Sequence, residues 1–234
     1  MKVSIIIPTL NEEKRIERTL KSLKDQDYWD RFELIVADGN STDNTVKIAM
    51  KYCNKVVTET THTIAAGRQA GADAATGDIL LFTDGDSIMD RSWVRKMSEA
   101  FENEKVAGAY GLIVPFEGGG IERMVLTYCA YFAASILNVI GIDYLAGSNM
   151  GVRKKAFDKI GGFNIHLTTG EDTDLMKRIR REGKTVFVPD AIVGYSLRRV
   201  RSWGYPKYVM FHTKNFFLSH ITGKPAEKYD AVRE

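Results

Sequence analysis

The segment Leu80-Leu81-Phe82-Thr83-Asp84-Gly85-Asp86 is a short apolar strand that ends in two carboxylates one residue apart. Strand ends of this kind are where α/β proteins build ligand sites. The pair alone is weak evidence, because 16 aspartates in 234 residues give roughly one Asp-x-Asp by chance. The chain contains three such pairs, which only their context can separate: Asp25/Asp27, Asp84/Asp86 and Asp172/Asp174.

The three aspartate pairs lie in different settings. Asp25/Asp27 falls in a polar turn and is interpreted as solvated surface, whereas Asp172/Asp174 opens a predicted helix. Asp84/Asp86 directly follows a strand that is apolar enough to be buried. Two carboxylates suit a hard divalent cation, and such a cation can neutralise a phosphate-bearing leaving group. The sequence therefore predicts a metal site at Asp84 and Asp86.

Strand and helix signals alternate on both sides of this segment. The first half is predicted to hold strands over 3–8, 32–37, 55–58 and 78–83, and helices capped by Asn11, capped by Ser41 or Thr42, and over 63–75 and 90–101. Repeated β-α-β units predict an α/β fold with a mostly parallel sheet and right-handed crossovers. After about residue 105 the regular alternation of strands and helices ends. Strands are expected over 106–115, 149–152, 185–189 and 192–195, and helices over 154–160 and 171–182.

The bulk properties indicate one large soluble domain in a reducing, cytoplasmic compartment. The chain is 44% hydrophobic and 27% charged, and it has two cysteines, which predicts no disulfide framework. The first apolar run is too short for a signal peptide and is interpreted as a strand. Of the net charge of +3, residues 195–234 carry +5 and the remainder −2. This basic segment is expected to face phosphates or an anionic membrane, unless it is simply a solvated tail.

Residues 124–142 contain no charged side chain. We exclude a membrane span, because Thr127, Tyr128, Ser135 and Asn138 dilute the run. A single crossing would also put the acidic groups at 84–86 and 171–172 on opposite sides of a bilayer. We expect a buried helix, with an interfacial helix or an oligomer contact as the alternatives.

Four further segments complete a pattern around Asp84-Gly85-Asp86. Together and in this order, the five segments resemble the family 2 glycosyltransferases of the GT-A fold, over roughly residues 3–200. The resemblance implies one catalytic domain, 1–234, with a Rossmann-like nucleotide-binding half (1–105), a mixed-sheet acceptor-binding half (106–200) and a C-terminal helical segment (201–234). The four segments are Pro8-Thr9-Leu10-Asn11-Glu12, Ala37–Thr45, Gly67-Arg68-Gln69-Ala70-Gly71 and Gly170-Glu171-Asp172-Thr173-Asp174-Leu175.

The resemblance also implies roles in binding a nucleotide sugar. Asp38 contacts the nucleoside and Arg68 lies near the nucleotide, while Asp86, the more direct ligand, and Asp84 hold Mn²⁺ or Mg²⁺. The alternative roles are local: helix capping at Asp38, helix entry at Pro8, Thr9 and Glu12, a surface position at Arg68 and a turn at Asp84-Gly85. Capping falls more naturally to Ser41 or Thr42, which would leave Asp38 free. The residues expected to bind the nucleotide sugar are Pro8, Thr9, Glu12, Asp38, Arg68, Asp84 and Gly85.

Asp172 is the candidate general base, and Glu171 is expected to orient the acceptor. One base with in-line attack inverts the anomeric centre, although acidic residues in a first helical turn also simply stabilise the helix dipole. Arg198, Arg199, Arg201 and Trp203 do not form the Gln-x-x-Arg-Trp element of processive members, which argues for transfer of a single sugar. The arginines are expected to clamp a diphosphate or face lipid headgroups, and Trp203 to stack on an acceptor sugar or pack internally.

The expected activity is metal-dependent, inverting transfer from a UDP- or GDP-type sugar to a sugar or polyprenyl-phosphate acceptor. Peripheral contact with the cytoplasmic membrane face is expected for a lipid acceptor, and no nucleic acid partner is expected. A nucleotidyltransferase is the nearest alternative, although its glycine-rich phosphate loop is missing, and a non-catalytic nucleotide-sugar-binding module is the other. The absence of Gly-x-Gly-x-x-Gly and Gly-Lys-Ser/Thr argues against a dehydrogenase and a phosphate-loop NTPase.

Overall fold

The computed structural model describes residues 1–28, 32–221 and 226. Its central feature is a sheet with the strand order β3-β2-β1-β4-β7-β6-β8-β5. The strands are β1 (Val3–Thr9), β2 (Phe32–Asp38), β3 (Lys55–Thr58), β4 (Ile79–Phe82), β5 (Ile88–Met89), β6 (Val106–Pro115), β7 (Met150–Arg153) and β8 (Lys184–Tyr195).

The first half of the chain forms the predicted parallel sheet. Strand β1 pairs in parallel with β2 and β4, and β2 pairs in parallel with β3. The strands are buried on both faces: Ile5 and Ile7 join one hydrophobic cluster and Ile6 the other, because successive strand residues point to opposite sides. The helices of this half are α1 (Ile16–Lys24), α2 (Thr45–Ala49), α3 (Ile64–Asp73) and α4 (Trp93–Ala100).

The second half forms the mixed part of the sheet. Strand β7 runs antiparallel to both β4 and β6, and β5 runs antiparallel to β8, while β6 and β8 are parallel. This confirms the expectation of a mostly parallel sheet with a mixed second half. The helices are α5 (Gly120–Val139), α6 (Lys154–Lys159), α7 (Glu171–Ile179), α8 (Arg198–Trp203) and α9 (Tyr205–Ile221).

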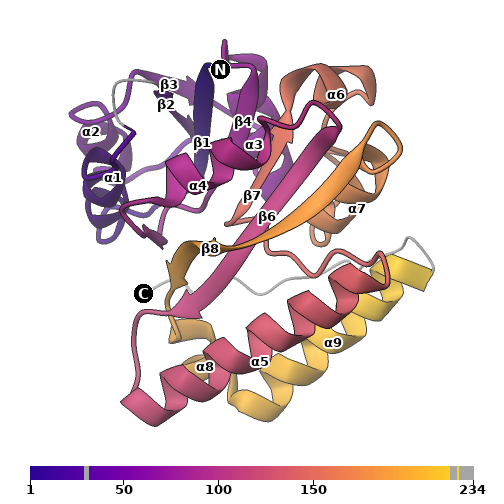
Figure 1. The fold of residues 1–234 in the computed structure, drawn as a ribbon. Helices are drawn as coiled ribbons and strands as arrows, with labels where there is room; N and C mark the ends of the chain where they lie inside the picture. Colours follow the sequence, from indigo (N-terminus) through magenta and orange to yellow (C-terminus); the bar gives the residue numbers. More distant parts are fainter. Residues whose placement is uncertain (29–31, 222–225, 227–234) are drawn as a thin grey trace.

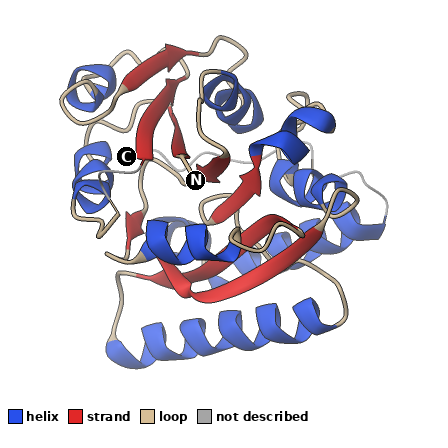
Figure 2. Cartoon of the chain, turned by 45° about the horizontal axis from the view of Figure 1, so that its top comes forward, coloured by secondary structure: helices blue, strands red, loops and turns tan. Residues whose placement is uncertain are grey.

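The helices of the two halves lie at different places around the sheet. In Figure 1 the two long helices, α5 and α9, lie at the bottom of the molecule, below the long β6–β8 ribbon, while α1 to α3 lie around the first strands. Helix α4 packs against β8 and β6. In Figure 2 the sheet is seen with helices on both of its sides. Residues 222–225 and 227–234, part of the predicted C-terminal helical segment, lie outside the described residues.

The predicted helix cap at Asn11 is wrong. Helix α1 begins at Ile16, and Asn11 adopts a left-handed backbone with φ of 56°. Its side-chain Oδ1 accepts a hydrogen bond of 2.9 Å from the backbone of Thr42. Asn11 therefore joins the loop after β1 to the loop after β2. Its hydrogen-bond partner lies in a distant segment, so the residues next to Asn11 in the sequence do not predict this contact.

Two predicted strands, 185–189 and 192–195, form the single strand β8. The ladder with β6 shifts register between Gly111 and Leu112, so that Gly111 pairs with Val188 and Leu112 with Ile192. Pro189 falls in this bulge, where its missing N–H breaks no ladder bond. The prediction that the strand ends at Pro189 is therefore wrong, because β8 continues to Tyr195.

The prediction that the uncharged segment forms a buried helix is also wrong. Helix α5 covers most of it, but Ala134 is its one buried residue. Large apolar side chains such as Phe132 and Val139 are 57% and 84% exposed. Among the described residues, no helix is long and apolar enough to cross a membrane.

Candidate active site

Arg68 links two parts of the predicted site that are far apart in the sequence. Its guanidinium is almost fully buried and lies 2.8 Å from Asp84 at the end of β4 and 2.5 Å from Glu171 at the start of α7. A guanidinium presents several N–H donors in a fixed plane, which suits two carboxylates at once. The predicted metal strand and the predicted base helix therefore meet at one side chain.

Burial and neighbouring charges shift the pKa values of the groups around Arg68. Burial raises the pKa of Glu171, as does the neighbouring charge of Asp172, while the Arg68 guanidinium opposes both. The pKa of Arg68 is raised by Asp84, Glu171 and Asp172 against the effect of its burial. Asp172 itself is only half buried, and its Oδ1 accepts a hydrogen bond from the Thr173 backbone. Asp172 is thus the more accessible of the two acids at this helix start.

Asp38 is a fixed part of the loop after β2 rather than a free carboxylate. It is 2% exposed, and it accepts hydrogen bonds from the Ser41 backbone at 2.7 Å, the Ser41 hydroxyl at 2.6 Å and the Thr9 hydroxyl at 3.1 Å. The expectation that Ser41 or Thr42 caps the next helix is wrong, because α2 begins at Thr45 after Asn44. Ser41 instead holds Asp38, and Thr9 shares that task.

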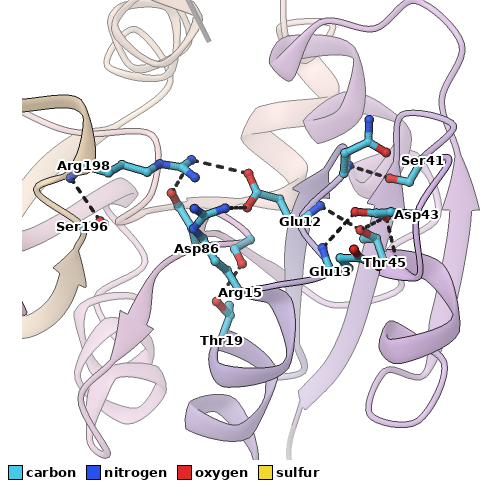
Figure 3. Close-up of polar contacts among 12 residues, drawn as sticks. Glu12, Glu13, Arg15, Thr19, Ser41, Asp43, Thr45, Asp86, Ser196 and Arg198 are labelled. Atoms are coloured by element: carbon cyan, nitrogen blue, oxygen red, sulfur yellow. Dashed lines mark hydrogen bonds and ion pairs between the residues drawn. The ribbon is translucent and has the colours of Figure 1, made fainter. Parts of the chain in front are cut away.

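Asp86 belongs to a second cluster of charges (Figure 3). Arg198 of α8 lies 2.8 Å from Asp86 and 3.5 Å from Glu12, and Arg15 lies 3.5 Å from the other oxygen of Glu12. Burial and the charge of Asp84 raise the pKa of Asp86. Burial and the charge of Asp86 raise the pKa of Glu12. In this cluster the arginines therefore offset only part of the effect of burial and of the neighbouring negative charges on the pKa of these carboxylates.

The remaining predicted residues divide between this site and its surroundings. The charge of Arg199 lowers the pKa of Asp86, and Arg201 pairs instead with Glu122 of α5 at 2.7 Å. Trp203 packs edge-on against Phe211 at 5.4 Å between ring centroids, and its stacking on an acceptor sugar stays a prediction. Gly85 accepts a hydrogen bond from Thr19 through its carbonyl, and Pro8 lies against α3, where a Cβ on Gly67 would be 3.0 Å away.

The other aspartates of the Asp-x-Asp pairs have ordinary surface roles. Asp25 and Asp27 are exposed, as predicted, and Asp27 forms an exposed ion pair with Arg95. Asp174 pairs with Arg178 one turn further along α7 at 2.6 Å. The three pairs therefore differ in their surroundings, as their sequence context indicated.

These elements bring the site to one edge of the sheet. Strands β1, β2 and β4 are parallel neighbours, and their carboxyl ends carry Thr9, Asp38 and Asp84. Helix α7 adds Asp172 from the second half of the chain, and α8 adds Arg198. Ligands of open α/β sheets bind at this edge.

A comparison with protein-family profiles identifies the family. The profile of glycosyl transferase family 2 matches residues 4–161, which is about two thirds of the chain. The chain belongs to glycosyl transferase family 2. The profile of the N-terminal domain of galactosyltransferase matches residues 139–212.

Relatives in this glycosyltransferase family are similar over part of their length. "Glycosyltransferase AglE" of Haloferax volcanii is 26% identical over 203 residues, covering 82% of this chain and 66% of its own. The "poly(ribitol-phosphate) beta-N-acetylglucosaminyltransferase TarS" of Staphylococcus aureus is 35% identical over 130 residues, covering 49% and 22%. The chain thus spans less than two thirds of the length of these relatives.

Solved structures of glycosyltransferases share the fold. The mannosyltransferase PcManGT from Pyrobaculum calidifontis, in complex with GDP-Man and Mn²⁺, has a TM-score of 0.73 at 22% identity and covers 96% of this chain and 66% of its own. S. aureus TarS 1–349 in complex with UDP-GlcNAc has a TM-score of 0.66 at 21% identity, with coverage of 84% and 58%. These likenesses confirm the GT-A fold of this family member.

One residue that supports the site has no signal in the sequence motifs. The backbone of Gly147 lies against the Arg68 guanidinium, and any Cβ there would collide with it. Glycine is common in loops, so only this three-dimensional contact shows its role. Asn149, two residues later, supports the fold instead: it is fully buried, its amide donates to Leu112 and Ala191 at 2.9 Å, and it accepts from the Trp93 indole at 2.8 Å.

Proposed function

We propose that this chain transfers one sugar from a nucleoside-diphosphate sugar to an acceptor, with inversion at the anomeric carbon. The observation that carries the proposal is the Arg68 bridge, which joins the strand end with Asp84 to the helix start with Asp172. Family membership supports the reaction class. The GDP-Man and UDP-GlcNAc complexes of structural neighbours support a GDP- or UDP-type donor.

The nucleoside is assigned to the loops after β1 and β2. Asp38 is held by Ser41 and Thr9, so its carboxylate is fixed in position before any ligand arrives. A fixed carboxylate can accept hydrogen bonds from a base N–H or a ribose hydroxyl without further loss of side-chain freedom. Pro8, Thr9 and Glu12, at the end of β1 and in the loop after it, are assigned to the same nucleoside site. Residues 1–105 then form the nucleotide-binding half and residues 106–200 the acceptor-binding half.

Asp84 and Asp86 would hold Mn²⁺ or Mg²⁺. Their oxygen donors suit these ions, and a cation would relieve the like charge that raises the pKa of Asp86. Within the described residues, no three potential ligand side chains form a metal-binding group, so phosphate oxygens and water would complete the coordination. The ion, once bound, would neutralise charge on the leaving diphosphate.

Asp172 takes the proton of the acceptor hydroxyl as that oxygen attacks the anomeric carbon. The bond from that carbon to the diphosphate oxygen breaks, and its electron pair leaves with the diphosphate. We assign Glu171 a positioning role, because it is buried against Arg68 rather than open to an acceptor. Arg198 lies close enough to Asp86 to contact the diphosphate at the same site.

The acceptor is a sugar hydroxyl or a polyprenyl phosphate. These two classes make different demands on Asp172. A hydroxyl must lose a proton to become a good nucleophile, whereas an ionised phosphate oxygen needs no base. A strong requirement for Asp172 would therefore favour a hydroxyl acceptor.

The substitution Asp172→Asn tests the function. Transfer to a hydroxyl acceptor should fall about 10²- to 10⁴-fold, while binding of the donor, measured by calorimetry, should persist. Asp174→Asn is the matched control, because Asp174 lies on the same helix but pairs with Arg178. Full activity of the Asp172 variant would refute the base assignment.

The same assay separates the other two functions. Binding of nucleotide sugars without turnover by the wild-type chain would indicate a non-catalytic module. Release of pyrophosphate from a nucleoside triphosphate and a sugar phosphate would indicate a nucleotidyltransferase.

A further inference from the structure

Helix α5 carries an exposed apolar stripe along its whole length. Six large side chains recur at intervals of three and four residues, which places them on one side of the helix. Each is at least 50% exposed, and Val139 reaches 84%. Such a continuous exposed apolar surface marks an interaction site. The stripe, called the α5 stripe below, consists of Ile121, Val125, Tyr128, Phe132, Ile136 and Val139.

The apolar surface continues from the stripe into a groove beside the helix. A groove of about 590 Å³ lies between α5 and β6, and its lining includes Leu112 and Val114 of β6 and Met124 and Tyr131 of α5. Tyr128 belongs to both the stripe and the groove. Arg123 also lines the groove, near the start of the helix. The surface is therefore broad, largely apolar and aromatic, with a cation at one end.

Positive charge lies on the two helices that follow β8, and part of it is at this same end of α5. Glu122, in the first turn, accepts hydrogen bonds from Arg201 and from the Tyr205 hydroxyl, so α8 and the start of α9 lie beside it. Residues 195–221 contain five lysines and arginines and no acidic residue. Arg201 and Lys207 are exposed, and Lys207 and Lys214 alternate with exposed Met210 and Phe217 on one side of α9.

The charge distinguishes a membrane from a second copy as the occupant. A two-fold contact through the α5 stripe would place this surface against itself, with its cations facing cations and few acids to match them. An anionic bilayer offers an apolar phase to the stripe and negative headgroups to the arginines and lysines. Aromatic side chains such as Tyr128 and Phe132 suit the boundary between these two phases.

We propose that the α5 stripe and the exposed cations Arg201, Lys207 and Lys214 dock this chain on an anionic membrane surface. Helix α5 lies in the membrane–water interface and does not cross the bilayer. This agrees with the described part of the chain, in which no helix is long and apolar enough to span a membrane. Arg198 of α8 contacts Asp86, so the docked surface lies next to the candidate active site. The docking itself requires no glycosyl transfer and is tested without it.

Vesicle flotation tests the proposal on the purified full chain. The wild type should float with vesicles of equal phosphatidylglycerol and phosphatidylcholine, and much less with phosphatidylcholine alone. Val125→Asp with Phe132→Asp should weaken the partition at least tenfold. Met50→Asp is the matched control, because Met50 is 65% exposed on the distant helix α2 and should float as the wild type does.

A charge-reversal pair separates the electrostatic part. Lys207→Glu with Lys214→Glu should reduce flotation with the anionic vesicles, whereas Lys47→Glu with Lys51→Glu, which changes the net charge equally at exposed positions, should reduce it less. A fluorophore on exposed Cys129, in a Cys53→Ser background, should shift its emission to the blue when anionic vesicles are added.

Three results would overturn the proposal. The first is a wild type that stays unbound to anionic vesicles even at low salt. The second is normal flotation of the double variant Val125→Asp with Phe132→Asp while its urea unfolding matches the wild type. The third is a dimer in sedimentation velocity that the Phe132→Asp change dissociates, because it would assign the stripe to a second copy instead.

Discussion

At the scale of single residues, Arg68 has the largest structural role. It is 1% exposed and pairs with two carboxylates from segments that are far apart in the chain. Buried ion pairs gain little over an apolar core, but removing one partner leaves the other charge buried without compensation. The stability of the site therefore depends on keeping all three side chains.

Replacing Arg68 by methionine should lower the free energy of unfolding by about 3–5 kcal/mol, because Asp84 and Glu171 lose their shared partner. Urea unfolding followed by circular dichroism measures the change. Arg95→Met is the matched control, since Arg95 also pairs with two carboxylates but is 40% exposed and should cost about 0–1 kcal/mol. Equal losses in both variants would contradict the special role of Arg68.

The sequence pointed to the candidate chemical groups more readily than to the residues that hold them in place. Asp84 and Asp172 stand out because each lies where an element starts or ends, which is a local property. The contact of Gly147 with Arg68 joins residues 79 positions apart along the printed sequence, and no local pattern reports it. The same holds for Ser41, which was expected to cap a helix and instead holds Asp38.

At the scale of elements, the termini and the environment of helices were the hardest to predict. An apolar run predicts a helix that seeks an apolar neighbour, but it does not say whether that neighbour belongs to the same chain. Helix α5 packs against β6 and β8 and leaves its other side exposed. Helix α9 also mixes exposed and half-buried positions. It contains His212, whose burial makes the stability of the chain depend on pH.

Burial lowers the pKa of His212 to about 4. Unfolding restores the ordinary value near 6.5, so the unfolded chain binds the proton more tightly, and stability falls as the pH drops from about 6.5 towards 4. Between pH 6.5 and pH 4, the unfolding free energy of His212→Phe should therefore fall by about 2 kcal/mol less than that of the wild type, after allowance for the partial exposure of His212. Urea unfolding at several pH values measures it.

The other histidines are common to both proteins, so their effects cancel in the difference between wild type and variant. His220, whose pKa burial also lowers, is the main example. Parallel pH profiles for the wild type and His212→Phe would show that His212 titrates alike in the folded and unfolded chains.

At the scale of the whole molecule, the alternating β-α pattern predicted the parallel half of the sheet. The order of the later strands was not predictable in this way, because β7 enters between β4 and β6 through contacts between distant segments. The folded sheet and α7 together bring Asp84, Asp172 and Arg68 into one neighbourhood. A ligand that binds across both halves should therefore stabilise the whole chain.

A nucleotide sugar with Mn²⁺ at about 100 times its dissociation constant should add about 2.7 kcal/mol to the unfolding free energy. For a chain of this size that raises the melting temperature by about 5–10 °C. Thermal shift with UDP- and GDP-sugars, with and without Mn²⁺, measures it. Asp86→Asn should lose most of the Mn²⁺-dependent part, and a shift that is the same with and without the ion would contradict metal dependence.

The pairing of Arg198 with Asp86 gives this carboxylate a counter-ion from the chain itself. A divalent ion that bound Asp86 would compete with this guanidinium, so its observed affinity would include the free energy of breaking the ion pair. Arg201 of the same short helix pairs with Glu122 of α5. Helix α8 therefore joins the carboxylate at Asp86 to the exposed apolar helix through two ion pairs.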